Sequence, residues 1–127
     1  MREVLLDTSI AIASFKQDAA IRAQLTTVQM VISATVLGEL YTGAYLATKT
    51  GQQLAYIAGI MWDSRLIDCD RATAERFGSI KADLQRRGHM IPVNDIWIAA
   101  SALQYGIPLA TRDAHFKNVT GLVVEEW

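Results

Sequence analysis

Short runs of aliphatic residues alternate along the chain with longer stretches of helical spacing. The runs are typical of buried strands, and they cover residues 4–6, 31–34, 66–67, 109–110 and 122–124. Strands that alternate with helices form parallel sheets with helices on both faces. The pattern therefore predicts an α/β fold.

The intervening stretches place their apolar residues on one face of a helix. They lie around residues 37–44, 51–62, 77–84 and 96–103. Asp70 and Gly88 are suited to begin and end the third helix. Pro92 and Asn94 are typical of the start of the fourth helix, and Gly106 is suited to end it. No repeat and no linker rich in Gly, Pro or Ser divides the chain, so we expect a single domain.

The composition favours a folded protein over a disordered one. Of the 127 residues, 51% are hydrophobic and only 20% are charged, which is enough apolar material for a core without disulfides. The single cysteine, Cys69, cannot form an internal disulfide, and its apolar neighbours predict a buried, unreactive thiol. No signal-peptide pattern and no membrane-spanning run is present, so we expect a cytoplasmic protein that does not enter the membrane.

Four acidic residues stand where a parallel sheet gathers its ligands. Asp7 directly follows the first apolar run, and Asp113 comes shortly after the run at 109–110. Glu39 and Asp95 are expected in the first turns of two helices. Because ligands of open parallel sheets bind outside the carboxyl ends of the strands, we expect all four carboxylates at one edge of the sheet.

Such a cluster would need a cation, since converging carboxylates repel one another and stay ionised only around a positive charge. Oxygen ligands favour Mg²⁺ or Mn²⁺ over zinc, and the spacing of His89, His115 and Cys69 does not match a zinc site. An acid after a strand or at a helix start is also a common cap, worth roughly 0.3–1 kcal/mol. For each acid considered alone, a helix-capping role therefore stays an alternative to metal binding.

The chain also resembles the PIN-domain endoribonucleases, and most closely the VapC-type toxins of toxin–antitoxin pairs. The resemblance is carried by residues 5–9, 33–40, 91–100, 109–116 and 121–127, in the right order and with ordinary spacing. The most specific segments surround two of the acids, Pro-Val-Asn-Asp-Ile-Trp at Asp95 and Thr-Arg-Asp-Ala-His-Phe at Asp113. The match spans essentially the whole chain.

This resemblance implies a PIN domain over residues 1–127, with a parallel five-stranded sheet between helices. It also implies that Mg²⁺ or Mn²⁺ is held by the four acids, which map to Asp7, Glu39, Asp95 and Asp113. Glu39 would be the acid that reaches the metal through water. Thr8 and Thr111 match hydroxyl positions that help to hold the site, and Thr111 is the one that would orient the attacking water.

The activity implied by the resemblance is that of a toxin endoribonuclease, in which metal-activated water attacks a phosphodiester of tRNA or rRNA. The implied partners are the RNA substrate, a VapB-type antitoxin and a second copy of the chain in a homodimer. Two alternatives stay open: a PIN-domain RNA-processing nuclease that is not a toxin, and a non-catalytic module that binds RNA or protein. A phosphoacceptor domain is disfavoured, because Ser9 stands where phosphatases of that kind need a second Asp.

The net charge of −1 gives no overall attraction to RNA. If metal neutralises the four acids, the remaining surface has a positive excess. Arg86, Arg87 and Arg112 are therefore candidate RNA contacts, although basic residues also favour helix C-termini because of the helix dipole. His115 is expected to be structural or partly exposed, since this mechanism needs no imidazole. Phe116 is expected in the core.

Overall fold

The computed structural model describes residues 1–127 and contains one sheet of five parallel strands. They are β1 (Glu3–Leu6), β2 (Gln29–Ser33), β3 (Arg65–Ile67), β4 (Leu109–Thr111) and β5 (Val124–Glu126). The strand order is β3-β2-β1-β4-β5, and every neighbouring pair is parallel. The predicted α/β class and five-stranded parallel sheet are confirmed.

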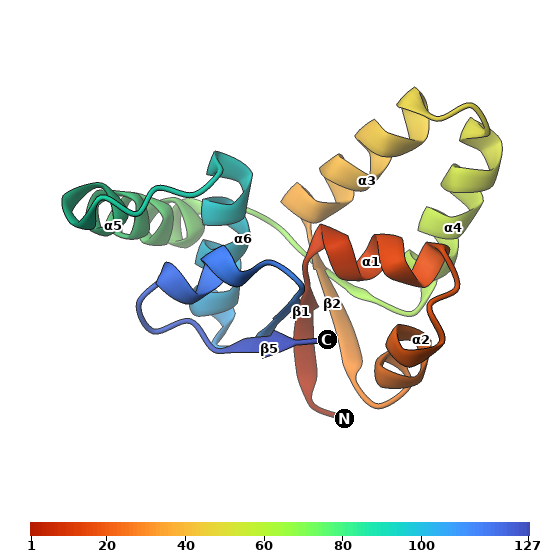
Figure 1. Ribbon diagram of the computed structural model, residues 1–127, viewed down its shortest axis with the longest axis horizontal. Helices are drawn as coiled ribbons and strands as arrows, with labels where there is room; N and C mark the ends of the chain where they lie inside the picture. The colour runs from red at the N-terminus through yellow and green to blue at the C-terminus, as the bar shows by residue number, and fades with distance from the viewer.

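Six α-helices and one 3₁₀ helix connect the strands. They are α1 (Thr8–Phe15), α2 (Ala19–Leu25), α3 (Ala34–Leu46), α4 (Thr50–Trp62), α5 (Arg71–Arg87), α6 (Val93–Tyr105) and η1 (Ala114–Asn118). Figure 1 shows α1 to α4 on one side of the strands and α5 and α6 on the other. This layering follows from right-handed crossovers, because the chain moves outward from β1 to β3 and then returns past β1 to β4.

The strands at the centre of the sheet are covered on both faces. Val4, Leu5 and Leu6 in β1 have no exposed surface, and neither do Leu109 and Ala110 in β4. This burial explains why these strands are continuous aliphatic runs instead of alternating patterns. The return of the chain past β1 makes the carboxyl ends of β1 and β4 a topological switch point, where open α/β sheets bind their ligands.

The predicted ends of two helices are confirmed. The side chain of Asp70 accepts a hydrogen bond from the backbone nitrogen of Thr73 and begins α5. Gly88 ends that helix with φ 71°, and Gly106 ends α6 with φ 64°. A positive φ is strained for residues with a side chain, which is why glycine stands at both positions.

Several predictions about local structure were wrong. The second strand stops at Ser33, because the Ser33 hydroxyl caps α3 by accepting a hydrogen bond from the backbone of Val36. The last strand begins at Val124. Cys69 is exposed, since β3 ends before it and leaves the thiol in a loop. Helices α1 and α2 were not predicted. No helix combines the length and the apolar character needed to cross a bilayer.

Candidate active site

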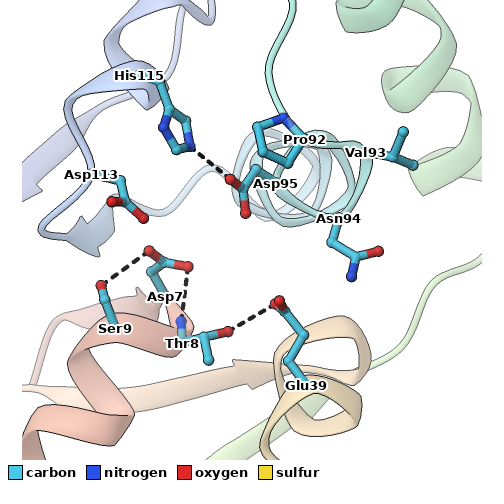
Figure 2. Close-up of a pocket in the computed structure, with 10 residues that line it drawn as sticks. All are labelled: Asp7, Thr8, Ser9, Glu39, Pro92, Val93, Asn94, Asp95, Asp113 and His115. Carbon is cyan, nitrogen blue, oxygen red and sulfur yellow. Dashed lines mark hydrogen bonds and ion pairs between the residues drawn. The ribbon is translucent and has the colours of Figure 1, made fainter. Parts of the chain in front are cut away.

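The structure brings all four predicted acids to one cleft of about 570 Å³ at the switch point of the sheet (Figure 2). Asp7 follows β1, Asp113 follows β4, Glu39 comes from α3 and Asp95 comes from α6. The cleft is lined by Asp7, Thr8, Ser9, Glu39, Pro92, Val93, Asn94, Asp95, Asp113 and His115. Four carboxylates separated widely in sequence therefore face a common space.

Asp7 is the most firmly held of these carboxylates, and only 3% of its surface is exposed. One oxygen, Oδ1, accepts a hydrogen bond of 2.8 Å from the backbone nitrogen of Thr8, which makes Asp7 the cap of α1. The other oxygen, Oδ2, accepts from the hydroxyls of Thr111 at 2.7 Å and Ser9 at 3.1 Å. The capping role and the candidate catalytic role thus coexist in one residue.

Glu39 lies in the second turn of α3, not in the first turn as predicted. The helix begins already at Ala34, because Ser33 caps it. The Oε1 oxygen of Glu39 accepts a 2.8 Å hydrogen bond from the hydroxyl of Thr8. Burial raises the pKa of this carboxyl, the Thr8 bond opposes the rise, and repulsion from Asp95 and Asp7 adds to it.

Asp95 lies in the first turn of α6, as predicted, with 15% of its side chain exposed. Burial raises its pKa. The contact with His115 opposes the rise, whereas the negative charges of Asp7 and Asp113 add to it. The 2.6 Å contact joins Nε2 of His115 to Oδ2 of Asp95.

Asp113 is the most exposed of the four acids and precedes η1. Its backbone nitrogen donates a 3.0 Å hydrogen bond to the Thr111 hydroxyl, the same group that donates to Asp7. Thr111 is fully buried beneath the cleft. Its hydroxyl therefore ties the ends of β1 and β4 together. Thr111 does not line the cleft, and its predicted orienting of the attacking water stays a prediction.

The chemistry of the donor set fits a hard divalent cation. All four acids offer oxygen ligands. The pKa values of Glu39 and Asp95 are raised mainly by burial, with a smaller contribution from the negative charges of neighbouring acids, which a bound cation would offset. In this arrangement no three Asp, Glu, His or Cys side chains lie close enough to share one ion. An ion would therefore be held partly through water or after small side-chain movements, and Mg²⁺ commonly keeps several of its waters.

None of the three arginines predicted to contact RNA lines the cleft. Arg112 forms a 2.7 Å ion pair with Asp18, the cap of α2, and this bond lowers the pKa of Asp18. Arg87 pairs with Asp83 at 2.8 Å and also donates to the carbonyl of Asn118. Arg86 is exposed and forms no ion pair. Their contact with RNA stays a prediction.

Sequence reasoning did not identify His115 as a residue of the site. Its side chain is 33% exposed, which agrees with the expected partial exposure, but its ring lies in the cleft against Asp95. Ser9 and Asn94 were also not identified, and both line the cleft. The available clue was proximity in sequence, since Ser9 lies two residues from Asp7, Asn94 precedes Asp95, and His115 lies two residues from Asp113.

A family model described as PIN domain matches residues 4–122. The chain belongs to the PIN domain family. Within that family it is a nuclease of the VapC type, as the resemblance predicted. It is 34% identical to the tRNA(fMet)-specific endonuclease VapC of Shigella flexneri, with coverage of 100% of this chain and 99% of the relative. It is 31% identical to Ribonuclease VapC2 of Haemophilus influenzae, with the same coverage.

Solved structures of this type have the same fold. In the structure of DNA-bound VapBC from Salmonella typhimurium, a chain with 29% sequence identity superposes with a TM-score of 0.92. The match covers 100% of the present chain and 99% of the solved one. The similarity thus extends over the strands, the helices and the segments that carry the four acids.

Proposed function

We propose that this chain is an endoribonuclease that depends on Mg²⁺ or Mn²⁺ and acts as the toxin of a VapBC-type pair. The observation that carries the proposal is the convergence of Asp7, Glu39, Asp95 and Asp113 on one cleft. Full-length similarity to proteins named ribonucleases supports RNA as the substrate. Similarity to a chain of a VapBC complex supports a VapB-type antitoxin as the partner.

After small side-chain movements, Asp7, Asp95 and Asp113 would hold the cation directly, and Glu39 would hold it through water. A bound cation supplies positive charge for the phosphate and makes a water molecule more acidic. Thr8, Ser9 and Thr111 keep Asp7 in one orientation through three hydrogen bonds. This rigidity matters because the reacting groups must be aligned before the chemical step.

Glu39 would accept the proton that the attacking water loses, since it would reach the cation through water and its carboxylate is oriented by the Thr8 hydroxyl. Its raised pKa makes it a better proton acceptor than an ordinary exposed carboxylate. The hydroxyl of Thr8 bonds one of its oxygens and fixes the side chain over the cleft. Thr8 thereby links the candidate base to Asp7, whose Oδ1 bonds the Thr8 backbone nitrogen.

The proposed substrate is structured cellular RNA, either tRNA or rRNA, which places the proposed action in the cytoplasm. The similarity to a relative named as specific for tRNA(fMet) favours tRNA. Arg71, Arg76 and Arg86 on α5 are exposed and form no ion pair, so they remain free to attract a phosphate backbone. The homodimer stays a prediction, and exposed Tyr45 and Trp62 on α3 and α4 could contribute to it.

RNA cleavage by the purified protein tests the proposed function. We expect bulk tRNA to be cut in the presence of Mg²⁺ and left intact when EDTA is present. D95N should lose at least about 100-fold in rate, because it removes one of the charges that bind the cation, while its thermal unfolding stays cooperative. Cleavage that is insensitive to EDTA, or a D95N variant with the normal rate, would contradict the proposal.

The antitoxin partner needs a separate experiment. A VapB-type antitoxin would be expected as a short protein encoded next to this chain, and it should co-purify with the chain and suppress its RNA cleavage when added in equimolar amount. An unrelated antitoxin of the same size serves as the matched control. Unchanged cleavage in the presence of the neighbouring protein would contradict the toxin assignment but leave the nuclease assignment intact.

A further inference from the structure

His115 makes the one side-chain hydrogen bond that the Asp95 carboxylate receives. Its Nε2 lies 2.6 Å from Oδ2 of Asp95. Figure 2 shows the second oxygen of Asp95 turned toward Asp7, into the space that the acids share. The imidazole therefore occupies one carboxylate oxygen and leaves the other free to act in the cleft.

Asp7, Glu39 and Asp95 differ in the side chains that hold them. Asp7 is held by Thr8, Ser9 and Thr111, and Glu39 is held by Thr8. None of these groups reaches Asp95, which comes from the opposite layer of the fold on α6. Without His115, no side-chain hydrogen bond would fix the orientation of the Asp95 carboxylate.

The segment that carries His115 is well anchored. Phe116, the next residue of η1, is fully buried, and the two rings lie 4.9 Å apart. Arg87 of α5 donates to the carbonyl of Asn118 at the end of η1, and Lys117 pairs with Glu126 of β5. The imidazole thus reaches Asp95 from a segment that is packed into the core through Phe116.

We propose that His115 is a positioning residue that orients Asp95 for cation binding, which presupposes the metal site proposed above. With Asp95 ionised, the proton of the contact lies on Nε2, so that the imidazole donates to Oδ2. Groups that orient a metal-binding carboxylate commonly contribute 10- to 100-fold to metal affinity. The role is distinct from catalysis, because His115 acts through Asp95.

Direct titration with Mn²⁺, followed by the electron paramagnetic resonance signal of the free ion, measures this effect without any cleavage assay. H115A should bind Mn²⁺ about 10- to 100-fold more weakly than the wild type. H115Q should stay within about threefold of the wild type, because the glutamine amide can donate from nearly the same position. H89A is the matched control, since the second histidine is exposed and lies outside the cleft, and its affinity should not change.

A double-variant comparison shows whether the effect passes through Asp95. In the D95N background, the additional H115A change should weaken Mn²⁺ binding no further, because the carboxylate to be oriented is gone. H115A with wild-type affinity, H115Q as weak as H115A, or a full additional loss in D95N would each overturn the positioning role. Absence of Mn²⁺ binding to the wild type would instead overturn the proposed metal site itself.

Discussion

Replacing Thr111 with valine perturbs the link between the two central strands at the site. The Thr111 hydroxyl donates to Oδ2 of Asp7 at 2.7 Å and accepts from the backbone nitrogen of Asp113 at 3.0 Å. The side chain is fully buried, and valine has nearly the same shape. The substitution therefore removes two hydrogen bonds while it leaves the packing volume almost unchanged.

The expected loss follows from these two bonds. A hydrogen bond to a charged group contributes about 1.5–3 kcal/mol to stability, and a neutral one about 0.5–1.5 kcal/mol. Asp7 retains two other donors, and Asp113 is exposed enough for water to reach its backbone. We therefore expect the lower end of the sum, about 2 kcal/mol. For a chain of this size that corresponds to a fall in Tm of roughly 6–10 °C.

Urea unfolding followed by circular dichroism, with EDTA present to exclude bound metal, measures this loss. T111S is the matched variant, because it keeps the hydroxyl and loses only a methyl group, at a cost of about 1 kcal/mol. T111S should also retain RNA cleavage, whereas T111V should lose most of it, because the Thr111 hydroxyl no longer links the Asp7 carboxylate to the backbone of Asp113. If T111V equals the wild type in stability and cleavage, or if T111S is the more damaged variant, the holding role of this hydroxyl is wrong.

Three further outcomes are expected. The pKa values of Glu39 and Asp95 are raised in the folded protein, so ionisation of these two carboxyls opposes folding. The free energy of unfolding of the metal-free protein should therefore fall as the pH rises above the ordinary pKa values, 4.5 for Glu39 and 3.8 for Asp95. It should level off once the pH exceeds the raised pKa values of the folded protein. E39Q should flatten that decline in urea titrations from pH 4 to 8, and an unchanged slope would contradict it. R112A should raise the KM for RNA several-fold and change the free energy of unfolding by less than about 1 kcal/mol. D18A breaks the same ion pair but keeps the arginine, so it should leave the KM for RNA unchanged. Equal effects of the two variants on KM would argue against a contact between Arg112 and RNA. F116A should lower the free energy of unfolding by about 3–5 kcal/mol in the same assay, and a loss below about 1 kcal/mol would show that this ring does not anchor the site.

The features that sequence reasoning predicted well depend on local patterns. The strand at 4–6 and the acid after it are visible because a doubly covered strand is continuously aliphatic and ends abruptly at Asp7. The ends of α5 and α6 are visible because glycine is needed where φ turns positive. By contrast, α1 is apolar on nearly every side, so its sequence carries no helical period to detect.

The features that were missed depend on contacts between distant residues. Arg112 is paired with Asp18, 94 positions away in the sequence, and no local pattern indicates that pairing. The contact of His115 with Asp95 joins η1 to the first turn of α6, and these two segments meet only in the folded chain. Glu39 was placed one turn too early, because the cap that begins α3 is Ser33, the last residue of the preceding strand.

The most direct test of the metal site is a crystal soaked with Mn²⁺ and measured for anomalous scattering. We expect an anomalous peak inside the cleft, bound directly by Asp7, Asp95 and Asp113, with Glu39 reaching it through water. The peak should be absent in D7N crystals soaked in the same way, because we expect that variant to keep the fold and to lose a central ligand. A Mn²⁺ peak bound elsewhere, or no peak in the cleft at millimolar Mn²⁺, would contradict the central claim.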